Sequence, residues 1–310
     1  MLKRFCPVLI LLLVFGFSTT LLGNESVQKY FPGTLDSFWV YEDQDGNELT
    51  RYSIEGEEIA GETYLSFSYD PELEDWANYS CFIHPGLYSV NDEGITLVVD
   101  KAVENAVEAR LKKEMDMFVE ILKQEVFSQA PPGVEIPAFN LDVDVEAQGQ
   151  ENFLLLPENV VADEEWDANQ VKVKAKMTME GPGVVTSDEP LGMDFTIIET
   201  GIVLGTETVE TIAGTFKDCL KVEYRTETTV VLTPTPSPDE VAPPGETVTT
   251  VWFAPNVGII KLHQKSGYMF LDMIPDDADF PVAPPPPTER TLELKRYEIK
   301  TAESESDTEN

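Results

Sequence analysis

Val171-Lys172-Val173-Lys174-Ala175-Lys176-Met177-Thr178 decides the fold class, because its apolar and polar residues alternate strictly. Successive side chains of a β-strand point to opposite faces, so this pattern places one face on a core and the other in water. Residues 141–146 repeat the alternation, with Leu141, Val143 and Val145 set against acidic residues. One-sided strands are typical of antiparallel sheets. The pattern therefore predicts a mainly β protein with an antiparallel sheet.

One segment has the helical period instead. Between Asp100 and Ser128 the apolar residues recur at steps of three and four, which marks one helix face: Val103, Val107, Leu111, Met115, Phe118, Leu122 and Val126. Asp100 is suited to cap the first turn, and Pro131-Pro132-Gly133 ends the pattern. We therefore expect one long amphipathic helix, residues 100–130, that covers an open face of the sheet.

The charge balance excludes several classes of partner. The chain has 21 Lys and Arg against 57 Asp and Glu, a net charge of −36. A protein that follows nucleic-acid phosphates needs a basic patch, and so does one that docks on anionic lipid. We expect no nucleic-acid partner. We also expect a monomer, because a high net charge keeps copies apart.

The first 23 residues predict an export signal. Lys3 and Arg4 supply the positive start, and residues 7–22 form an uncharged, mostly apolar stretch. The alternative is a retained membrane anchor, although the stretch is short for the roughly 20 residues of a spanning helix. Cys6 precedes the apolar stretch, whereas an acylated cysteine would follow it. We expect export to the periplasm, the cell surface or the medium.

Two cysteines remain after the signal, Cys81 and Cys219. An oxidising compartment allows them to form a disulfide. The loop that it closes would be long, and the chain-entropy model gives about 4–5 kcal/mol for such a loop. The alternative is two separate buried thiols. The sequence leaves both open, because joined cysteines need Cα atoms within about 7 Å of each other.

A weak repeat divides the chain into two β units. Trp39 and Trp166 each follow a proline by seven to nine residues, and Ile59-Ala60-Gly61 and Ile212-Ala213-Gly214 each precede an apolar strand. The alternative is chance similarity of hairpins. A duplication predicts two similar β units, a first at 24–99 and a second with Pro-rich loops at 131–300. With the signal at 1–23, the helix at 100–130 and a disordered acidic tail at 301–310, these units make up the whole chain.

Three pieces of sequence carry a resemblance to a family: Tyr30-Phe31-Pro32 with Trp39-Val40-Tyr41, Ala213–Val222, and Trp252–Lys261. They resemble a family of secreted bacterial β-rich proteins of uncharacterised function, distantly similar to curved-sheet carriers of the lipoprotein-localisation type. These motifs are structural and cover about half the chain, so no catalytic residue carries over. The resemblance implies a mainly β (α+β) fold. In it, a curved antiparallel sheet or half-barrel from two similar β units holds the helix in its concavity.

Recognised catalytic motifs are absent from the sequence. It contains no nucleophile elbow, zinc-protease motif or phosphate-binding loop. We interpret its two histidines, His84 and His263, as structural. Asp43–Glu48 partly resembles the start of a calcium loop, but Gly46 comes two places early, so a two-residue Asp45-Gly46 hairpin turn is favoured. We expect no enzyme, no cofactor and no metal site.

Large apolar side chains are the candidate ligand-binding residues. Methionine adapts to an acyl chain, and tryptophan lines apolar cavities or stacks on sugars. The alternative for each residue is a place in the hydrophobic core. The candidates are Leu111, Met115 and Phe118 on the helix, with Trp39, Trp166 and Trp252 on the strands.

Three functions compete. The first is an exported, non-enzymatic binding or carrier-like protein that holds a lipid or other apolar ligand between sheet and helix; it fails if the helix seals the sheet. The second is a cell-surface structural or interaction protein that presents Pro-rich loops 233–246 and 275–288 to an extracellular macromolecule. The third is a polymer hydrolase, which needs two carboxylates about 5–10 Å apart in a cleft. The sequence favours the first.

Overall fold

The computed structural model describes residues 27–59, 61–73, 83, 86–129, 140–180, 190–234, 242–274 and 286–300. Within them the elements, in chain order, are η1 (Val27–Tyr30), β1 (Phe38–Asp43), β2 (Glu48–Ile54), β3 (Glu58–Ile59), β4 (Glu62–Thr63), β5 (Leu65–Asp70), β6 (Leu87–Asn91), β7 (Gly94–Val98), α1 (Asp100–Gln129), β8 (Asn140–Gly149), β9 (Asn152–Pro157), β10 (Glu165–Glu180), β11 (Leu191–Thr211), β12 (Gly214–Thr233), β13 (Thr247–Ala254), β14 (Gly258–Ser266), η3 (Leu271–Met273) and β15 (Thr288–Glu298).

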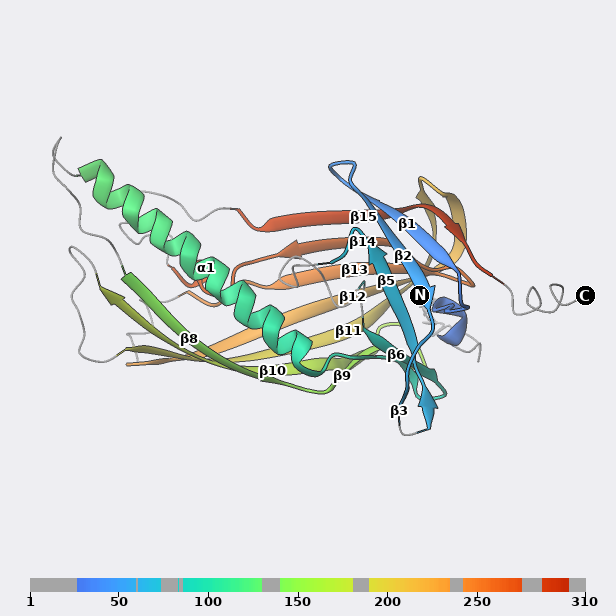
Figure 1. Cartoon of the computed structure of the whole chain (residues 1–310), viewed down its shortest axis with the longest axis horizontal. Helices are drawn as coiled ribbons and strands as arrows, with labels where there is room; N and C mark the ends of the chain where they lie inside the picture. Colours follow the sequence, from blue (N-terminus) through green and yellow to red (C-terminus); the bar gives the residue numbers. More distant parts are fainter. Residues whose placement is uncertain are drawn as a thin grey trace, which may run out of the picture.

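One antiparallel sheet organises the molecule. Its thirteen strands follow the order β8-β10-β11-β12-β13-β14-β15-β1-β2-β5-β6-β7-β9, and β3 and β4 form a separate ribbon. The sheet is open, with β8 and β9 at its edges. The long strands run along the molecule, and β1, β2 and β5 cross them steeply at one end (Figure 1). The predicted mainly β fold with an antiparallel sheet is confirmed.

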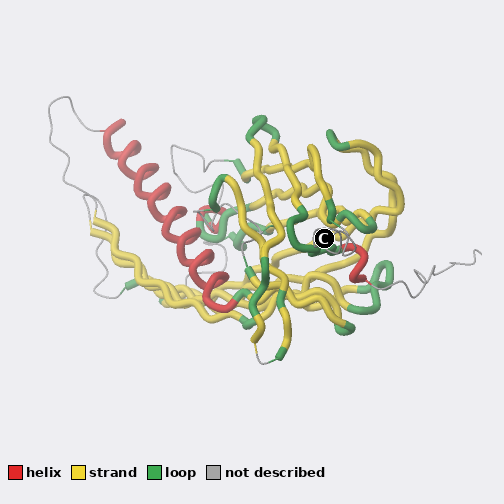
Figure 2. Tube along the Cα trace, turned by 45° about the vertical axis from the view of Figure 1, so that its right-hand side comes forward, coloured by secondary structure: helices red, strands yellow, loops and turns green. Residues whose placement is uncertain are grey.

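The predicted helix is confirmed as α1, which lies across the concave side of the sheet at the end away from β1 (Figures 1 and 2). Its apolar stripe faces inward, with Leu111, Met115 and Phe118 buried, whereas Lys112 and Asp116 are exposed. Full burial of three such side chains stabilises the docked helix by about 5–9 kcal/mol, an upper estimate. The hydrophobic effect therefore holds α1 on the sheet.

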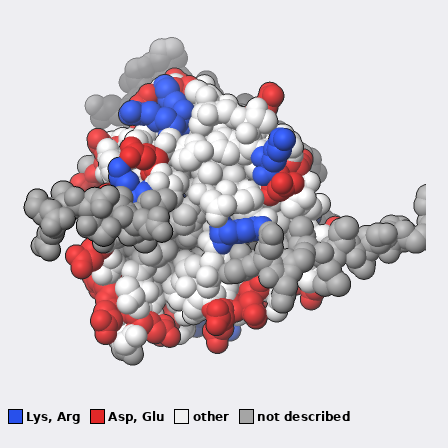
Figure 3. Space-filling model, turned by 90° about the vertical axis from the view of Figure 1, so that its right-hand side faces the viewer, with Lys and Arg blue, Asp and Glu red and all other residues white. Residues whose placement is uncertain are grey.

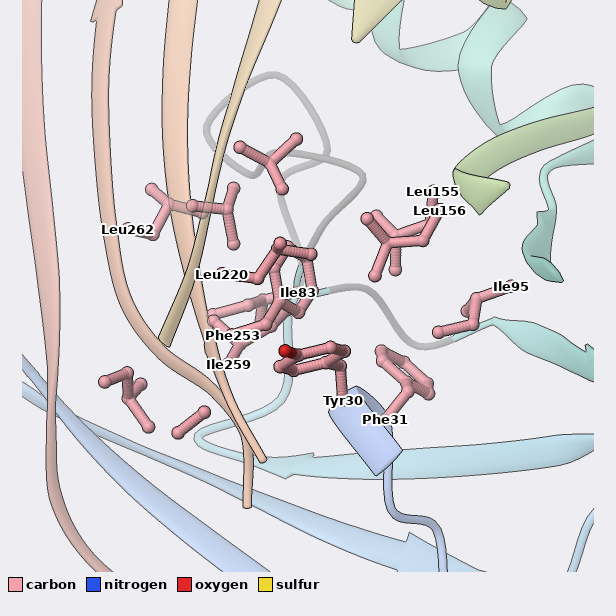
Figure 4. Close-up of a cluster of buried hydrophobic side chains, with 14 of the residues drawn as sticks. Tyr30, Phe31, Ile83, Ile95, Leu155, Leu156, Leu220, Phe253, Ile259 and Leu262 are labelled. Carbon is pink, nitrogen blue, oxygen red and sulfur yellow. The ribbon is translucent and has the colours of Figure 1, made fainter. Parts of the chain in front are cut away.

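The buried apolar side chains form two clusters. The first, termed the sheet core, lies near η1, where side chains of η1, β7, β9 and β12–β14 converge (Figure 4). Its largest fully buried members are Trp39, Tyr41, Tyr88, Phe153, Tyr224 and Phe253. The second, termed the helix core, joins α1 to β10, β11 and the segment after β14; its members are Leu111, Met115, Phe118, Val171, Val173, Ala175, Met177, Met193, Phe195, Ile197, Tyr268, Met269, Phe270, Leu271 and Met273.

A buried arginine lies inside the sheet core. Arg51 on β2 is 3% exposed, and its guanidinium carbon lies 3.4 Å from the ring centre of Phe67. The rings of Phe31, Trp39 and Tyr88 surround it at 5.1, 5.6 and 5.5 Å. Its Nε and Nη2 have no hydrogen-bond partner among the described residues. Cation–π attraction, about 2 kcal/mol or more when desolvated, offsets part of the cost of burying this charge.

The family-like motifs join the N-terminal segment and β1 to the β13–β14 hairpin in the middle of the sheet. Asn256 in the β13–β14 hairpin donates its backbone N–H to the Lys29 carbonyl at 2.6 Å. Trp39 on β1 donates its indole N–H to the Val257 carbonyl at 2.6 Å, and Tyr41 donates its hydroxyl to the Ile259 carbonyl at 2.9 Å. Both sequence units thus share one continuous sheet. The duplication itself stays a prediction.

The hairpin predicted at Asp45-Gly46 is confirmed, but its predicted length is wrong. Strand β1 ends at Asp43 and β2 begins at Glu48, so four residues form the loop instead of two. The Asp43 carboxylate accepts backbone N–H groups of Asp45 and Asn47 at 2.9 and 2.8 Å. These bonds, which the sequence period does not reveal, stabilise the longer turn.

Several expectations fall outside the described residues. These are the signal at 1–23, Cys81, His84, residues 235–241 and 275–285 of the Pro-rich loops, and the tail at 301–310. Leu292 and Leu294, on one face of β15, are both buried.

Trp166 on β10 lies across Gly201 on β11, directly opposite in the strand register. A Cβ placed on Gly201 would lie 2.3 Å from the indole Cζ2 atom. The indole is fixed by its N–H bond to the Leu154 carbonyl at 3.0 Å and by edge contact with Tyr224. Because the ring is held from two sides, it cannot move aside at low cost.

We expect Gly201→Ala to lower the free energy of unfolding by about 1–3 kcal/mol, because the new methyl group overpacks the site. Gly192→Ala is the matched control on the same strand, where a Cβ would meet its nearest atom at 3.5 Å. It should be neutral or stabilise by up to about 1 kcal/mol. Urea denaturation measures both variants; equal losses would contradict the packing of Trp166.

Candidate functional site

A buried carboxylate connects α1 to the segment after β14. Residues 267–274 follow β14, contain η3 and are here termed the strap. Glu114 of α1 is 2% exposed and accepts backbone N–H groups of Met269 at 2.9 Å, Phe270 at 2.7 Å and Leu271 at 3.4 Å. Burial raises the pKa of Glu114, although Arg110 and the three N–H donors oppose the rise. These three bonds, termed the latch, join helix and strap.

Further contacts order the strap. Arg110 lies 3.4 Å from Glu114 and also donates a hydrogen bond to the Gly267 carbonyl. Asp272 accepts the backbone N–H of Tyr268 at 2.8 Å, which closes a turn within the strap. The rings of Phe118 and Phe270 meet edge to face at 5.3 Å. Polar contacts thus hold an apolar segment between helix and sheet.

A row of polar side chains crosses the concave face between the two cores. Strand register places its five members directly opposite one another on β10, β11, β12, β13 and β14: Asn169, Glu199, Thr226, Thr247 and Ser266. This set is termed the polar row. On β11, Met193, Phe195 and Ile197 of the helix core precede Glu199, and Val203 of the sheet core comes after it. The row therefore separates the two apolar regions.

Glu199 is the ionisable member of the polar row. Its deep position raises the pKa of its carboxyl to about 7, and the charge of Arg110 lowers it only in part. Yet the side chain is only half-buried, so part of its surface stays accessible. Farther along the row, Thr247 on β13 and Ser266 on β14 share a hydrogen bond at 2.9 Å between their hydroxyls. A carboxyl with the pKa of Glu199 changes charge near neutral pH.

The two cores differ in composition. Five buried methionines belong to the helix core, and Met117 packs against it, which accounts for six of the eight in the chain: Met115, Met117, Met177, Met193, Met269 and Met273. None of the described members of the sheet core is a methionine. Methionine is flexible and polarisable, and it lines surfaces that accept varied partners. The helix core is therefore the more adaptable of the two.

The predicted ligand-binding residues fall into two places. Leu111, Met115 and Phe118 lie together in the helix core at 0, 1 and 7% exposure. Trp39 is instead a buried member of the sheet core, and Trp166 and Trp252 pack against that core. The indole N–H of Trp252 also bonds to Glu207. The tryptophans therefore do not line the space beneath the helix.

A shallow, open depression lies along α1. Lys113, Asp116 and Glu120 form its polar part, and Met117 and Ile121 its apolar part. Met117 and Ile121 also pack against the helix core. Apolar contact therefore continues from the surface of α1 to the buried helix core.

Sequence reasoning missed Glu114 and Glu199. Both continue an apolar pattern. Glu114 lies between Leu111 and Met115 on the buried helix face, and Glu199 continues the inward series that ends at Ile197. The sequence signal that could have identified them is a carboxylate at a position where the periodicity predicts an apolar side chain.

The remaining candidate groups have structural surroundings. Cys219 is fully buried in the sheet core, and burial raises the pKa of its thiol to about 11. Its predicted disulfide partner lies outside the described residues, so the pairing stays a prediction. His263 lies 2.8 Å from Glu289. In the described ranges, no group of His, Cys, Asp and Glu has the arrangement of a metal site.

Charged side chains are unevenly distributed over the face of the molecule seen in Figure 3. At the end of the molecule seen in Figure 3, basic side chains form separate groups around an uncharged centre, and acidic ones gather along the lower margin. No described helix combines the length and apolar character needed to span a membrane.

We expect Glu199→Gln to remove a pH-dependent loss of stability. Because folding raises the pKa of Glu199 from 4.5 to about 7, the folded state holds the proton more tightly. Wild-type stability should therefore fall as the pH rises through this window, by about 1–3 kcal/mol after allowance for solvent screening. The variant should match the wild type near pH 4 and exceed its stability by this amount near pH 8.

Urea denaturation across this pH range provides the measurement. Asp194→Asn on the exposed face of β11 is the control, and it should keep the wild-type pH dependence. An unchanged slope in Glu199→Gln would show that the Glu199 carboxyl is not held in a desolvated site.

Comparison with known proteins gives a family match over part of the chain. A family model described as DUF3108-like matches residues 133–267. This region contains β8–β14, hence the polar row, but not α1. No curated protein matches the sequence.

Two solved structures also match. A predicted lipoprotein from Parabacteroides distasonis ATCC 8503 is 16% identical, with a TM-score of 0.34 over 87% of this chain and 98% of that chain. A predicted exported protein with a YmcC-like fold from Bacteroides fragilis NCTC 9343 is 14% identical, with a TM-score of 0.37 over 86% of this chain and 98% of that chain. The chain is therefore similar over residues 133–267 to a DUF3108-like family of uncharacterised function.

Proposed function

We propose that this chain is an exported, non-enzymatic binding protein that receives a lipid or other apolar ligand between α1 and the sheet. The observation that carries the proposal is the composition of the helix core. Six of the eight methionines of the chain lie in it or against it. A core that serves stability alone gains from stiff, well-defined side chains, whereas a core that must repack around a guest gains from methionine.

The way in which α1 is attached is consistent with a helix that can separate from the strap. The latch and the Arg110 bond to Gly267 join α1 to the strap, which is not part of a sheet ladder. Separation of helix and strap therefore breaks no strand pairing. Met117 and Ile121 extend the apolar contact to the depression beside α1, which offers a route of entry.

The competing interpretation is that α1 only closes the core. In the closed state Leu111 and Met115 are almost fully buried, as that interpretation requires. A ligand must therefore displace α1 or the strap, and the latch sets the free energy of that displacement. A weakened latch distinguishes the two interpretations, because it should increase ligand affinity only if α1 opens to admit the ligand.

Export and the absence of catalysis are parts of the proposal. Residues 1–23 have the composition of an export signal. Raised carboxyl pKa values also occur in enzymes. Here, within the described part of the chain, no hydrogen bond joins a Ser, Thr or Cys to a histidine or carboxylate base, the pairing that activates such a nucleophile.

Binding of the apolar fluorophore N-phenyl-1-naphthylamine tests the proposal. We expect the folded protein, purified without detergent and stripped of lipid, to bind the dye saturably at a single site, with a rise in fluorescence as the dye leaves water. Native mass spectrometry should show the matching one-to-one adduct. The absence of saturable binding by folded protein would contradict the proposal.

We expect Glu114→Gln to bind the same dye several-fold more tightly than the wild type. The amide cannot accept the strap N–H groups as a carboxylate does, so the open state becomes more populated and the apparent Kd falls, by up to roughly tenfold. Asp116→Asn on the exposed side of the same helix is the control and should leave the Kd unchanged. Equal affinity in all three proteins would show that α1 does not gate the site.

A further inference from the structure

Glu199 has hydrogen-bonding capacity that its neighbours do not use. None of the described residues donates a hydrogen bond to its carboxyl. Arg110 contacts Glu114 and the Gly267 carbonyl. Of its two direct register partners, Asn169 and Thr226, Asn169 uses its side-chain oxygen to accept the Gln170 backbone N–H at 2.7 Å. The carboxyl of Glu199 is therefore free to receive a donor.

Its position suits one end of an elongated ligand. The side chains of Met193, Phe195 and Ile197 precede Glu199 on the inner face of β11, and all three belong to the helix core. An apolar chain that lies along the helix core would thus end beside the polar row. The residue is half-buried and its carboxyl is desolvated. A ligand group would therefore reach the carboxyl once α1 or the strap is displaced.

The charges near Glu199 select the sign of that end. Arg110 is the charged group that acts on Glu199, and it is already paired with Glu114 at 3.4 Å, while Asp272 of the strap lies near Tyr268. The neutral Tyr268 also faces this set, since its pKa is raised by burial and by both carboxylates. With Glu199 ionised, negative charge predominates locally, as it does over the whole chain at −36. An anionic headgroup is repelled, whereas a cation gains an uncommitted carboxylate.

We propose that Glu199 receives the positively charged end of a cationic amphiphile whose alkyl chain lies along the helix core. This inference rests on the proposed function and names its ligand class: a molecule with one ammonium group and an apolar chain. An ionised carboxylate binds ammonium more tightly than a neutral one. The affinity should therefore increase as the pH rises through neutrality, while a simple amine stays protonated.

Competition against N-phenyl-1-naphthylamine tests the inference with three ligands of equal chain length: decylammonium, decanol and decanoate, each below its aggregation threshold. At pH 8 we expect decylammonium to displace the dye at roughly tenfold lower concentration than decanol, the effect of one charge-assisted hydrogen bond. Decanoate should be weaker than both. Near pH 5 the preference for decylammonium should shrink several-fold.

Glu199→Gln should lose the preference for decylammonium while it keeps the affinity for decanol. Asp194→Asn, on the outer face of β11, should retain the wild-type order and its pH dependence. A decylammonium preference that survives in Glu199→Gln would overturn the inference. So would tighter binding of decanoate, which would indicate Arg110 as the receiving group. In both cases the proposed function stands, whereas it fails if the protein binds neither the dye nor any of the three ligands.

Discussion

A carboxylate that is 2% exposed must find donors, and the position of Glu114 therefore constrains much of this structure. Its donors are three backbone N–H groups of the strap, which connects β14 towards β15 across the concave face. The apolar stripe that contains Leu111 and Met115 would bury itself on any apolar face, because the hydrophobic effect is not directional. The latch fixes the position at which α1 docks on the strap and the sheet. It places Phe118 against Phe270 and brings Arg110 towards Glu199.

The division of the interior into two regions results from the strand register. Five directly paired residues form the polar row, so the part of the concave face that packs against α1 and the part that encloses the aromatic sheet core are chemically separate. The sheet core contains rigid aromatic residues and a caged Arg51. The helix core contains methionines and residues of the strap, which lies outside the sheet ladder. One region is built for stability and the other for adaptation, which is the physical basis of the proposed binding role.

Much of the fold could be predicted from residue periodicity. The alternation at Val171–Thr178 assigned inner and outer faces, and the three-and-four spacing from Val103 to Val126 located α1. Strand register and tertiary pairing could not be predicted. The residue pattern of a strand does not show which strand it pairs with, or which residues face each other in the pair. The tryptophans show this limit. Size and aromaticity made Trp39 a ligand candidate, but its hydrogen bond to the Val257 carbonyl ties two distant segments inside the sheet core.

Hydrogen exchange followed by mass spectrometry tests the central claim, which is that the latch holds α1 and the strap as one closing unit. The comparison is between the wild type and Glu114→Gln. We expect faster exchange in the peptides of α1 and of the strap, by a similar factor in both, with unchanged exchange in β12 and β13. Faster exchange in the strap alone, or in every strand at once, would contradict the claim.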